Sequence, residues 1–137
     1  LQASAGTILA LAAAVKNTKS AVENKKMIIL RFKTINLDIF EAIKDRKKKV
    51  ETRAATERYR NIKVGDTIKL VCGKKSFEMK VKKVKIFKTI TAILKKYKPE
   101  IINPKTHTVK EARAMWYGFP RYKEKIRKYG LIALELE

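Results

Sequence analysis

In the segment Lys47-Lys48-Lys49-Val50-Glu51-Thr52-Arg53, the uncharged residues Val50 and Thr52 alternate with the charged residues Lys49, Glu51 and Arg53. This period of two residues predicts a β-strand with one buried face. On such a strand Glu51 and Arg53 point to the same side, and Lys48 lies where the strand begins. We therefore expect a carboxylate, a guanidinium and an amine to converge on one small patch.

Working outward, similar patterns predict four more strands. They cover Met27–Phe32, Thr67–Cys72, Ser76–Phe87 and Leu131–Leu136. The alternation breaks at Lys82-Lys83, which predicts a β-bulge that returns the apolar residues to one face. The gaps between these strands are mostly short, so we expect antiparallel pairing.

Short helices are predicted between the strands. The first follows Asn36, whose side chain is expected to cap it, and another covers 90–97 and ends before Pro99. Thr108 and Glu111 form a capping box that opens a third helix, and a fourth covers 121–128. Residues 54–63 are polar and basic and are expected to form a loop. The fold class is therefore α+β, a small curved antiparallel β-barrel with flanking short helices.

Residues 1–26 differ from the rest because they are rich in alanine and lack this alternation. A helix is expected from about Thr7 to Glu23, with an apolar run too short to span a membrane. Met27 resembles a natural start. We therefore interpret 1–26 as a helical extension or a remnant of cloning, and 27–137 as the folded domain.

The charge of the chain points to a polyanionic partner. Lys and Arg number 34 against 13 Asp and Glu, which gives a net charge of +21. RNA is the partner we expect, DNA is possible, and a membrane is not expected, because no basic helix with a wide apolar face is apparent. One Cys and one His form no zinc site, so we expect no metal and no cofactor, and a cytoplasmic protein. The oligomeric state stays open.

Four aromatic residues lie close together among basic ones near the carboxyl end. These are Trp116, Tyr117, Phe119 and Tyr122. Aromatic residues at helical spacing usually belong to the core, and we expect Trp116 to be buried. Tyr122, and after it Tyr117, are the candidates for lining a cleft in which a base stacks.

The order of these features resembles that of the ASCH domain (ASC-1 homology) of the PUA-like superfamily. Lys48, Glu51 and Arg53 match the pattern G-x-K-x-x-E-x-R, and the segments 62–68 and 129–133 support the resemblance. The chain departs from the pattern where Arg46 replaces the usual glycine. Arg46 must then adopt a backbone conformation that glycine reaches more easily, or the turn is built differently.

The resemblance implies a cleft that holds RNA or a nucleotide, bordered here by Lys48, Glu51, Arg53 and Tyr122. Some small members of the family hydrolyse N4-acetylcytidine, and nuclease activity has been proposed for others. In the hydrolase branch the motif lysine is catalytic, and a threonine nucleophile occupies the position of Glu51. The resemblance therefore implies a catalytic role for Lys48, but this chain has Glu51 in place of the threonine nucleophile.

Two functions follow as hypotheses. The first is RNA binding, with the backbone phosphates on a set of basic residues: Arg58, Arg60, Lys63, Lys74, Lys75, Lys80, Lys82, Lys83 and Lys85. The alternative is a small amidohydrolase or nuclease that acts on a modified nucleoside or on RNA, with Lys48 and Glu51 as acid and base. Spacing alone favours a simpler interpretation, in which Glu51 and Arg53 form an exposed ion pair of little energetic weight.

Overall fold

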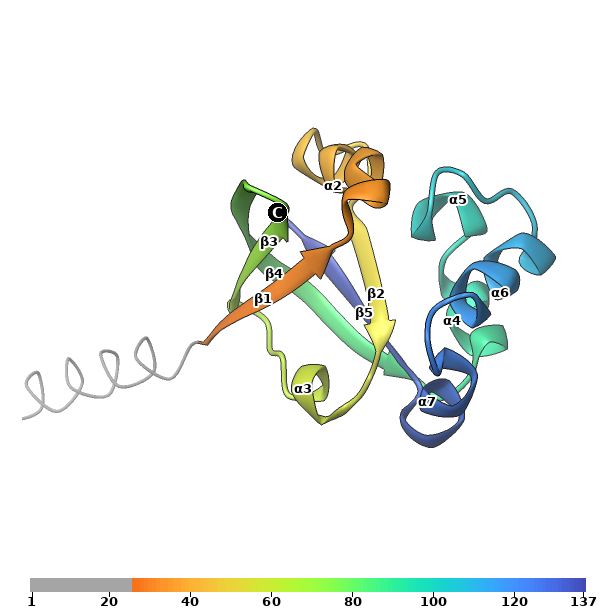
Figure 1. Cartoon of the computed structure of the whole chain (residues 1–137). Coiled ribbons are helices and arrows are strands. Elements are labelled where there is room, and N and C mark those ends of the chain that lie inside the picture. Colours follow the sequence, from red (N-terminus) through yellow and green to blue (C-terminus); the bar gives the residue numbers. More distant parts are fainter. Residues whose placement is uncertain (1–25) are drawn as a thin grey trace, which may run out of the picture.

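The structure is a computed structural model that describes residues 26–137. The helix expected between Thr7 and Glu23 lies outside the described residues. The described part is an α+β fold in which a five-stranded sheet curls into a half-barrel and short helices pack around it (Figure 1), as the sequence predicted. Figure 1 shows α4, α5, α6 and α7 gathered together beside the sheet, away from α2.

All five predicted strands are present. They are β1 (Met27–Phe32), β2 (Val50–Ala54), β3 (Thr67–Cys72), β4 (Lys75–Phe87) and β5 (Leu131–Leu136). Their order in the sheet is β1-β3-β4-β5-β2, so β1 and β2 are the two edge strands.

The expectation that every pair is antiparallel was wrong for one pair. β1 runs parallel to β3, whereas β3–β4, β4–β5 and β2–β5 are antiparallel. The chain between β1 and β3 passes through α2, β2 and α3, and this connection is long enough for the crossover that a parallel pair requires. The sheet is therefore mixed.

The predicted bulge in β4 is present. The pairing of β4 with β5 shifts register between Val81 and Lys83. Val81 before the shift and Val84 after it both pack in the same apolar cluster. One extra residue therefore keeps the apolar side chains of this long strand inside and its lysines outside.

Helices connect the strands. They are a 3-10 turn η1 (Thr34–Asn36), α2 (Leu37–Lys44), α3 (Glu57–Arg60), α4 (Ile90–Lys96), α5 (Pro99–Ile102), α6 (Val109–Tyr117) and α7 (Tyr122–Tyr129). Thr108 caps α6 as predicted, because its hydroxyl oxygen accepts from the Glu111 N–H at 3.1 Å, and the same hydroxyl donates to the Glu111 Oε1 at 3.1 Å. None of the helices in residues 26–137 is long and apolar enough to cross a membrane.

Three details of the helices differ from the sequence predictions. Asn36 does not cap α2 through its side chain, because it belongs to the preceding 3-10 turn, and its own N–H bonds the carbonyl of Lys33 at 2.8 Å. The expected loop 54–63 contains α3, and a further helix, α5, begins at Pro99. α3 buries no side chain, so it leaves no apolar periodicity in the sequence.

Helix α2 ends in a Schellman motif. The N–H of Lys47 bonds the carbonyl of Ala42 at 2.9 Å, and the N–H of Arg46 bonds the carbonyl of Ile43 at 3.1 Å. Arg46 has φ 61°, the left-handed conformation that usually selects glycine at this position. Of the two alternatives left open by the sequence, the first is therefore found: Arg46 adopts the conformation that glycine reaches more easily, and the turn directs the chain into β2.

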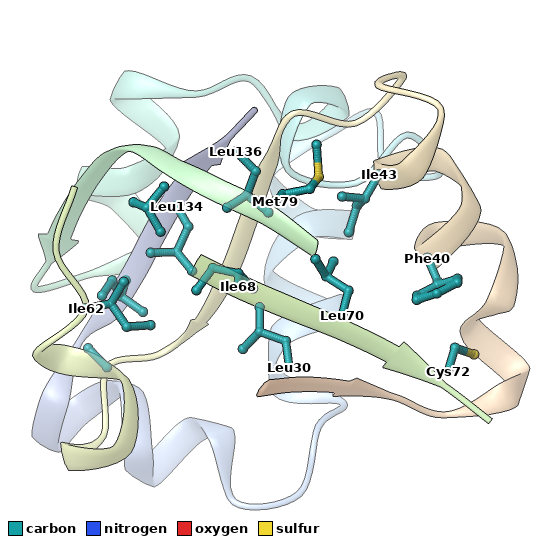
Figure 2. Close-up of a cluster of buried hydrophobic side chains, with 13 residues drawn as sticks. Leu30, Phe40, Ile43, Ile62, Ile68, Leu70, Cys72, Met79, Leu134 and Leu136 are labelled. Atoms are coloured by element: carbon teal, nitrogen blue, oxygen red, sulfur yellow. The ribbon is translucent and has the colours of Figure 1, made fainter. Parts of the chain in front are cut away.

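Two apolar clusters lie on opposite faces of β5. Figure 2 shows the first, in which Leu30, Leu70 and Leu134 from the curled sheet pack with Phe40 of α2 and Ile62. The second cluster joins the other face of the sheet to helices α4 to α7. Its buried members are Val50, Phe87, Ile90, Ile93, Ile102, Ala112, Trp116, Ile126, Leu131 and Ala133. β5 is covered on both sides, which explains its nearly continuous apolar sequence.

Candidate functional site

Successive side chains of β2 point alternately toward the helices and toward the concave side of the half-barrel. Val50 packs with the helical cluster, and the buried indole N–H of Trp116 donates to the hydroxyl oxygen of Thr52 at 3.0 Å. Because neighbouring residues of a strand point to opposite faces, Glu51 and Arg53 point to the concave side of the half-barrel. β2 therefore presents its charged face toward β1.

Lys48, Glu51 and Arg53 are in direct contact, and we call them the β2 charge cluster. The Lys48 Nζ lies 3.2 Å from the Glu51 Oε1, and the Arg53 Nη2 lies 3.5 Å from the Glu51 Oε2. Lys48 also donates to the carbonyl oxygen of Val50, and the Glu51 Oε1 accepts from the N–H of Thr52 at 3.0 Å. The structure thus brings together the three residues that the sequence predicted to converge.

This cluster is buried, unlike the exposed ion pair that spacing alone favoured. Lys48 is 3% exposed and Glu51 is 7% exposed, while the Arg53 side chain retains 18% exposure. No buried side-chain nitrogen or oxygen of residues 26–137 lacks a hydrogen-bond partner. Lys48 and Glu51 are therefore satisfied by the protein itself, and Arg53 is the member that reaches the surface.

Burial and charge shift the pKa values of the cluster. Burial lowers the pKa of the Lys48 amine, and Glu51 opposes that shift only in part. For Glu51 burial alone would raise the pKa, but the charges of Lys48 and Arg53 outweigh it, so the net pKa is lowered. Glu51 is therefore a carboxylate near neutral pH, in contact with the Lys48 amine and the Arg53 guanidinium.

Arg53 spans the opening between the two edge strands. Its Nη2 donates to the carbonyl oxygen of Arg31 in β1 at 3.3 Å, and its guanidinium carbon lies 4.9 Å from the centre of the Phe32 ring. Such a cation–π contact stabilises by about 0.5–1 kcal/mol at an exposed position. The guanidinium thus links β2 to β1 where the half-barrel is not closed by backbone pairing.

Tyr122 lies beside this opening. Its hydroxyl oxygen accepts from the N–H of Ala54, at the end of β2, at 3.3 Å. Burial raises the pKa of Tyr122, and the charge of nearby Arg53 acts in the opposite direction. The fourth residue predicted to border the cleft is therefore next to the β2 charge cluster.

A cavity of about 150 Å³ lies between the start of β2, the bulge of β4 and the end of β5. Four cationic, two acidic and two apolar residues line it: Arg46, Lys48, Lys49, Lys82, Glu135, Glu137, Met79 and Leu136. Glu51, Arg53 and Tyr122 are not among these residues. Of the four residues expected to border a cleft, this cavity is lined by Lys48 alone.

The basic residues predicted to contact a nucleic-acid backbone are all exposed. They are Arg58, Arg60 and Lys63 around α3, and Lys74, Lys75, Lys80, Lys82, Lys83 and Lys85 on or beside β4. Within residues 26–137, ion pairs engage Lys48, Arg53, Lys75 and Lys105. Most of the surface cations in the described part are therefore exposed and form no ion pair within 4.0 Å.

Sequence reasoning missed several partners of the site. Arg31 and Phe32 contact Arg53 from β1, and Trp116 holds Thr52 from α6. These contacts join residues that are 21 to 64 positions apart in the sequence, so no local pattern predicts them. The aromatic residues between 116 and 122 were the one feature of the sequence that indicated any of these partners.

Comparison with known proteins gives relatives but no assigned activity. No family model matches the chain, and no curated protein matches it. Its fold is similar to that of hypothetical protein PH0355, with a TM-score of 0.65, 30% identity, and coverage of 82% of this chain and 97% of that one. It is also similar to protein PF0455 from Pyrococcus furiosus, with a TM-score of 0.61, 32% identity, and coverage of 82% and 94%. The chain belongs to the same family as these two archaeal proteins.

Proposed function

We propose that this protein is an ASCH-type, PUA-like domain that binds RNA. The observation that carries the proposal is the exposed and largely unpaired positive charge. Residues 1–26 hold four lysines and one glutamate, which leaves +18 of the net charge of +21 on residues 27–137. Charge of one sign on this scale opposes compact folding, and a polyanionic ligand offsets that repulsion.

The backbone phosphates bind the exposed cations around β4 and α3 in this proposal. The bulge at Lys82 keeps the lysines of β4 outside while its apolar residues stay in the core. The lysines consequently line one continuous strand rather than scattered loops. Each phosphate neutralised by such a cation releases counterions, so binding weakens as salt is added.

Arg53 and Tyr122 border the site for one nucleotide. Arg53 keeps part of its guanidinium exposed at the opening between β1 and β2, and the Tyr122 hydroxyl bonds the N–H of Ala54, the next residue of β2. A guanidinium binds a phosphate or the edge of a base through paired hydrogen bonds. Glu51 lies beneath and contacts the guanidinium, and Lys48 in turn contacts Glu51, so in this proposal the two residues position Arg53.

The hydrolase remains the alternative from the sequence, with Lys48 and Glu51 as acid and base. A general acid or base must reach the proton that it transfers. Lys48 is 3% exposed and its amine already has two acceptors within the protein, so the geometry supports binding better than hydrolysis. Incubation with N4-acetylcytidine tests the alternative directly: turnover that vanishes with Lys48→Ala would favour it.

The proposal is tested by titrating a labelled RNA into the protein across a salt series. The wild type is compared with Arg53→Lys, and with Lys110→Ala as a control that removes one exposed charge from the first turn of α6. The triple variant Lys80→Gln, Lys82→Gln, Lys83→Gln should reduce the salt slope by about 2, since each single-strand phosphate contact contributes about 0.7.

Arg53→Lys should lose more affinity than Lys110→Ala at every salt concentration, because lysine keeps the charge and lacks the planar fork. Equal behaviour of these two variants would leave a general cationic surface without a nucleotide site. Absence of binding at low salt would overturn the proposal as a whole. Thermal unfolding of each variant verifies that it is folded.

A further inference from the structure

The junction between α6 and α7 exposes two aromatic rings to solvent. Tyr117 is 40% exposed and Phe119 is 41% exposed. The other large apolar side chains exposed in residues 26–137 are aliphatic. We call Tyr117 and Phe119 the aromatic platform. Neither ring is needed in the two apolar clusters, so its exposure calls for another explanation.

The segment that carries the platform is anchored to β2 by its neighbours Trp116 and Tyr122. Trp116, directly before Tyr117, is fully buried and bonds Thr52. The N–H of Phe119 bonds the carbonyl of Trp116 at 3.1 Å, and the N–H of Tyr122 bonds the carbonyl of Phe119 at 3.2 Å. The Phe119 and Tyr122 rings pack with their centres 5.0 Å apart. A ring that is fixed in this way loses little conformational entropy when a ligand stacks on it.

Cations flank the rings on α7. The Lys123 Nζ lies 5.8 Å from the centre of the Tyr117 ring, and the Lys125 Nζ lies 5.8 Å from the centre of the Tyr122 ring. Tyr122 in turn bonds Ala54, next to Arg53 in β2. Lysines of α7 therefore lie beside the rings of Tyr117 and Tyr122.

Aromatic faces interleaved with cations are the chemistry of single-stranded nucleic-acid binding. Unpaired bases stack on exposed rings while lysines bind the phosphates that connect them. In a duplex the bases are already stacked on one another, so they offer no free face to Tyr117 or Phe119. Duplex binding needs only the charges.

We infer that the ligand is single-stranded RNA whose unpaired bases stack on Tyr117 and Phe119, with Lys123 at the adjoining phosphate. This inference rests on the RNA-binding function proposed above and narrows its substrate class. When an aromatic side chain that stacks on a base is replaced by alanine, the affinity falls roughly fivefold to more than a hundredfold per base.

The test compares a labelled single strand of about 12 nucleotides with the same strand annealed to its complement. The wild type is measured beside Phe119→Ala and Tyr117→Ala. The matched control is Val109→Ala, which truncates another exposed apolar side chain of α6, 52% exposed, outside the platform. Phe119→Trp serves as the rescue variant because it restores a stacking face.

The wild type should prefer the single strand. Phe119→Ala and Tyr117→Ala should each weaken single-strand binding at least about fivefold, with the salt slope and duplex binding unchanged. Val109→Ala should bind like the wild type, and Phe119→Trp should recover the affinity. The fluorescence of the introduced indole should be quenched by the single strand, whereas Trp116 is buried and should not respond.

The outcomes separate the two proposals. If no RNA binds at low salt, the proposed function fails and this inference fails with it. If RNA binds but the duplex binds as tightly as the single strand, or the platform variants bind like Val109→Ala, the inference alone is overturned. Both substituted side chains are exposed, so the variants should fold, and thermal unfolding checks this.

Discussion

Glu51→Gln should lower the free energy of unfolding of the domain far more than an ordinary surface substitution does. The change keeps the shape of the side chain and removes its charge, which leaves Lys48 buried without a counter-charge. At 3.2 Å and an effective dielectric constant of about 20, the attraction between Lys48 and Glu51 is about 5 kcal/mol. Removing one member of a buried pair typically destabilises by about 3–5 kcal/mol. We expect a loss of that size at pH 7.

The measurement is denaturant unfolding followed by circular dichroism, with Lys48→Met and the double variant Lys48→Met, Glu51→Gln beside it. Because the double variant leaves no buried charge unpaired, it should be more stable than the sum of the two single changes predicts, with a coupling of about 0.5–3 kcal/mol. If Glu51→Gln costs less than about 1 kcal/mol, or the two changes add without coupling, solvent screens the pair and the buried cluster is refuted.

The pH dependence follows from the same two groups. The pKa of Glu51 in the folded state lies below its ordinary value of 4.5, so its contribution to stability is complete above that pH and is lost as the pH falls through the folded-state value. The pKa of Lys48 is lowered from 10.5, so the unfolded chain binds the proton more tightly and stability increases as the pH rises toward 10.5. Glu51→Gln removes the carboxylate that raises the pKa of Lys48. In that variant the increase should begin at a lower pH.

Three further predictions concern the surroundings of the site. Arg46→Gly should stabilise the domain by about 1 kcal/mol in denaturant unfolding, because it relieves the left-handed conformation at the end of α2; lower stability would contradict this explanation of the turn. Thr52→Val should leave the indole N–H of Trp116 buried without an acceptor and cost about 1–3 kcal/mol, whereas Thr52→Ser should cost much less. Burial and a 2.7 Å hydrogen bond to Glu135 raise the pKa of Tyr97 to about 12. An absorbance titration should show this midpoint, and Glu135→Gln should lower it while burial keeps it above the ordinary value.

The sequence predicted the elements whose pattern is local. The five strands were found because burial of one or both faces imposes a period of two or a continuous apolar run on the residues. The bulge at Lys82 was visible as a change of parity, and the capping box of α6 as a spacing of three residues. Helix α3 was not predicted because none of its residues is fully buried, so its sequence shows no apolar periodicity.

For the site, the sequence by itself determined that Glu51 and Arg53 share a face of β2 and that Lys48 lies near them, since strand geometry fixes this. Only the tertiary structure decided that the face is covered. The sheet curls so that the edge strand β1 approaches β2, and Arg53 bonds the backbone of Arg31 across the opening. Burial depends on such contacts between distant residues, and so do the parallel pairing of β1 with β3 and the lowered pKa of Lys48. A local pattern specifies the direction of a side chain, and the folded chain specifies what it meets there.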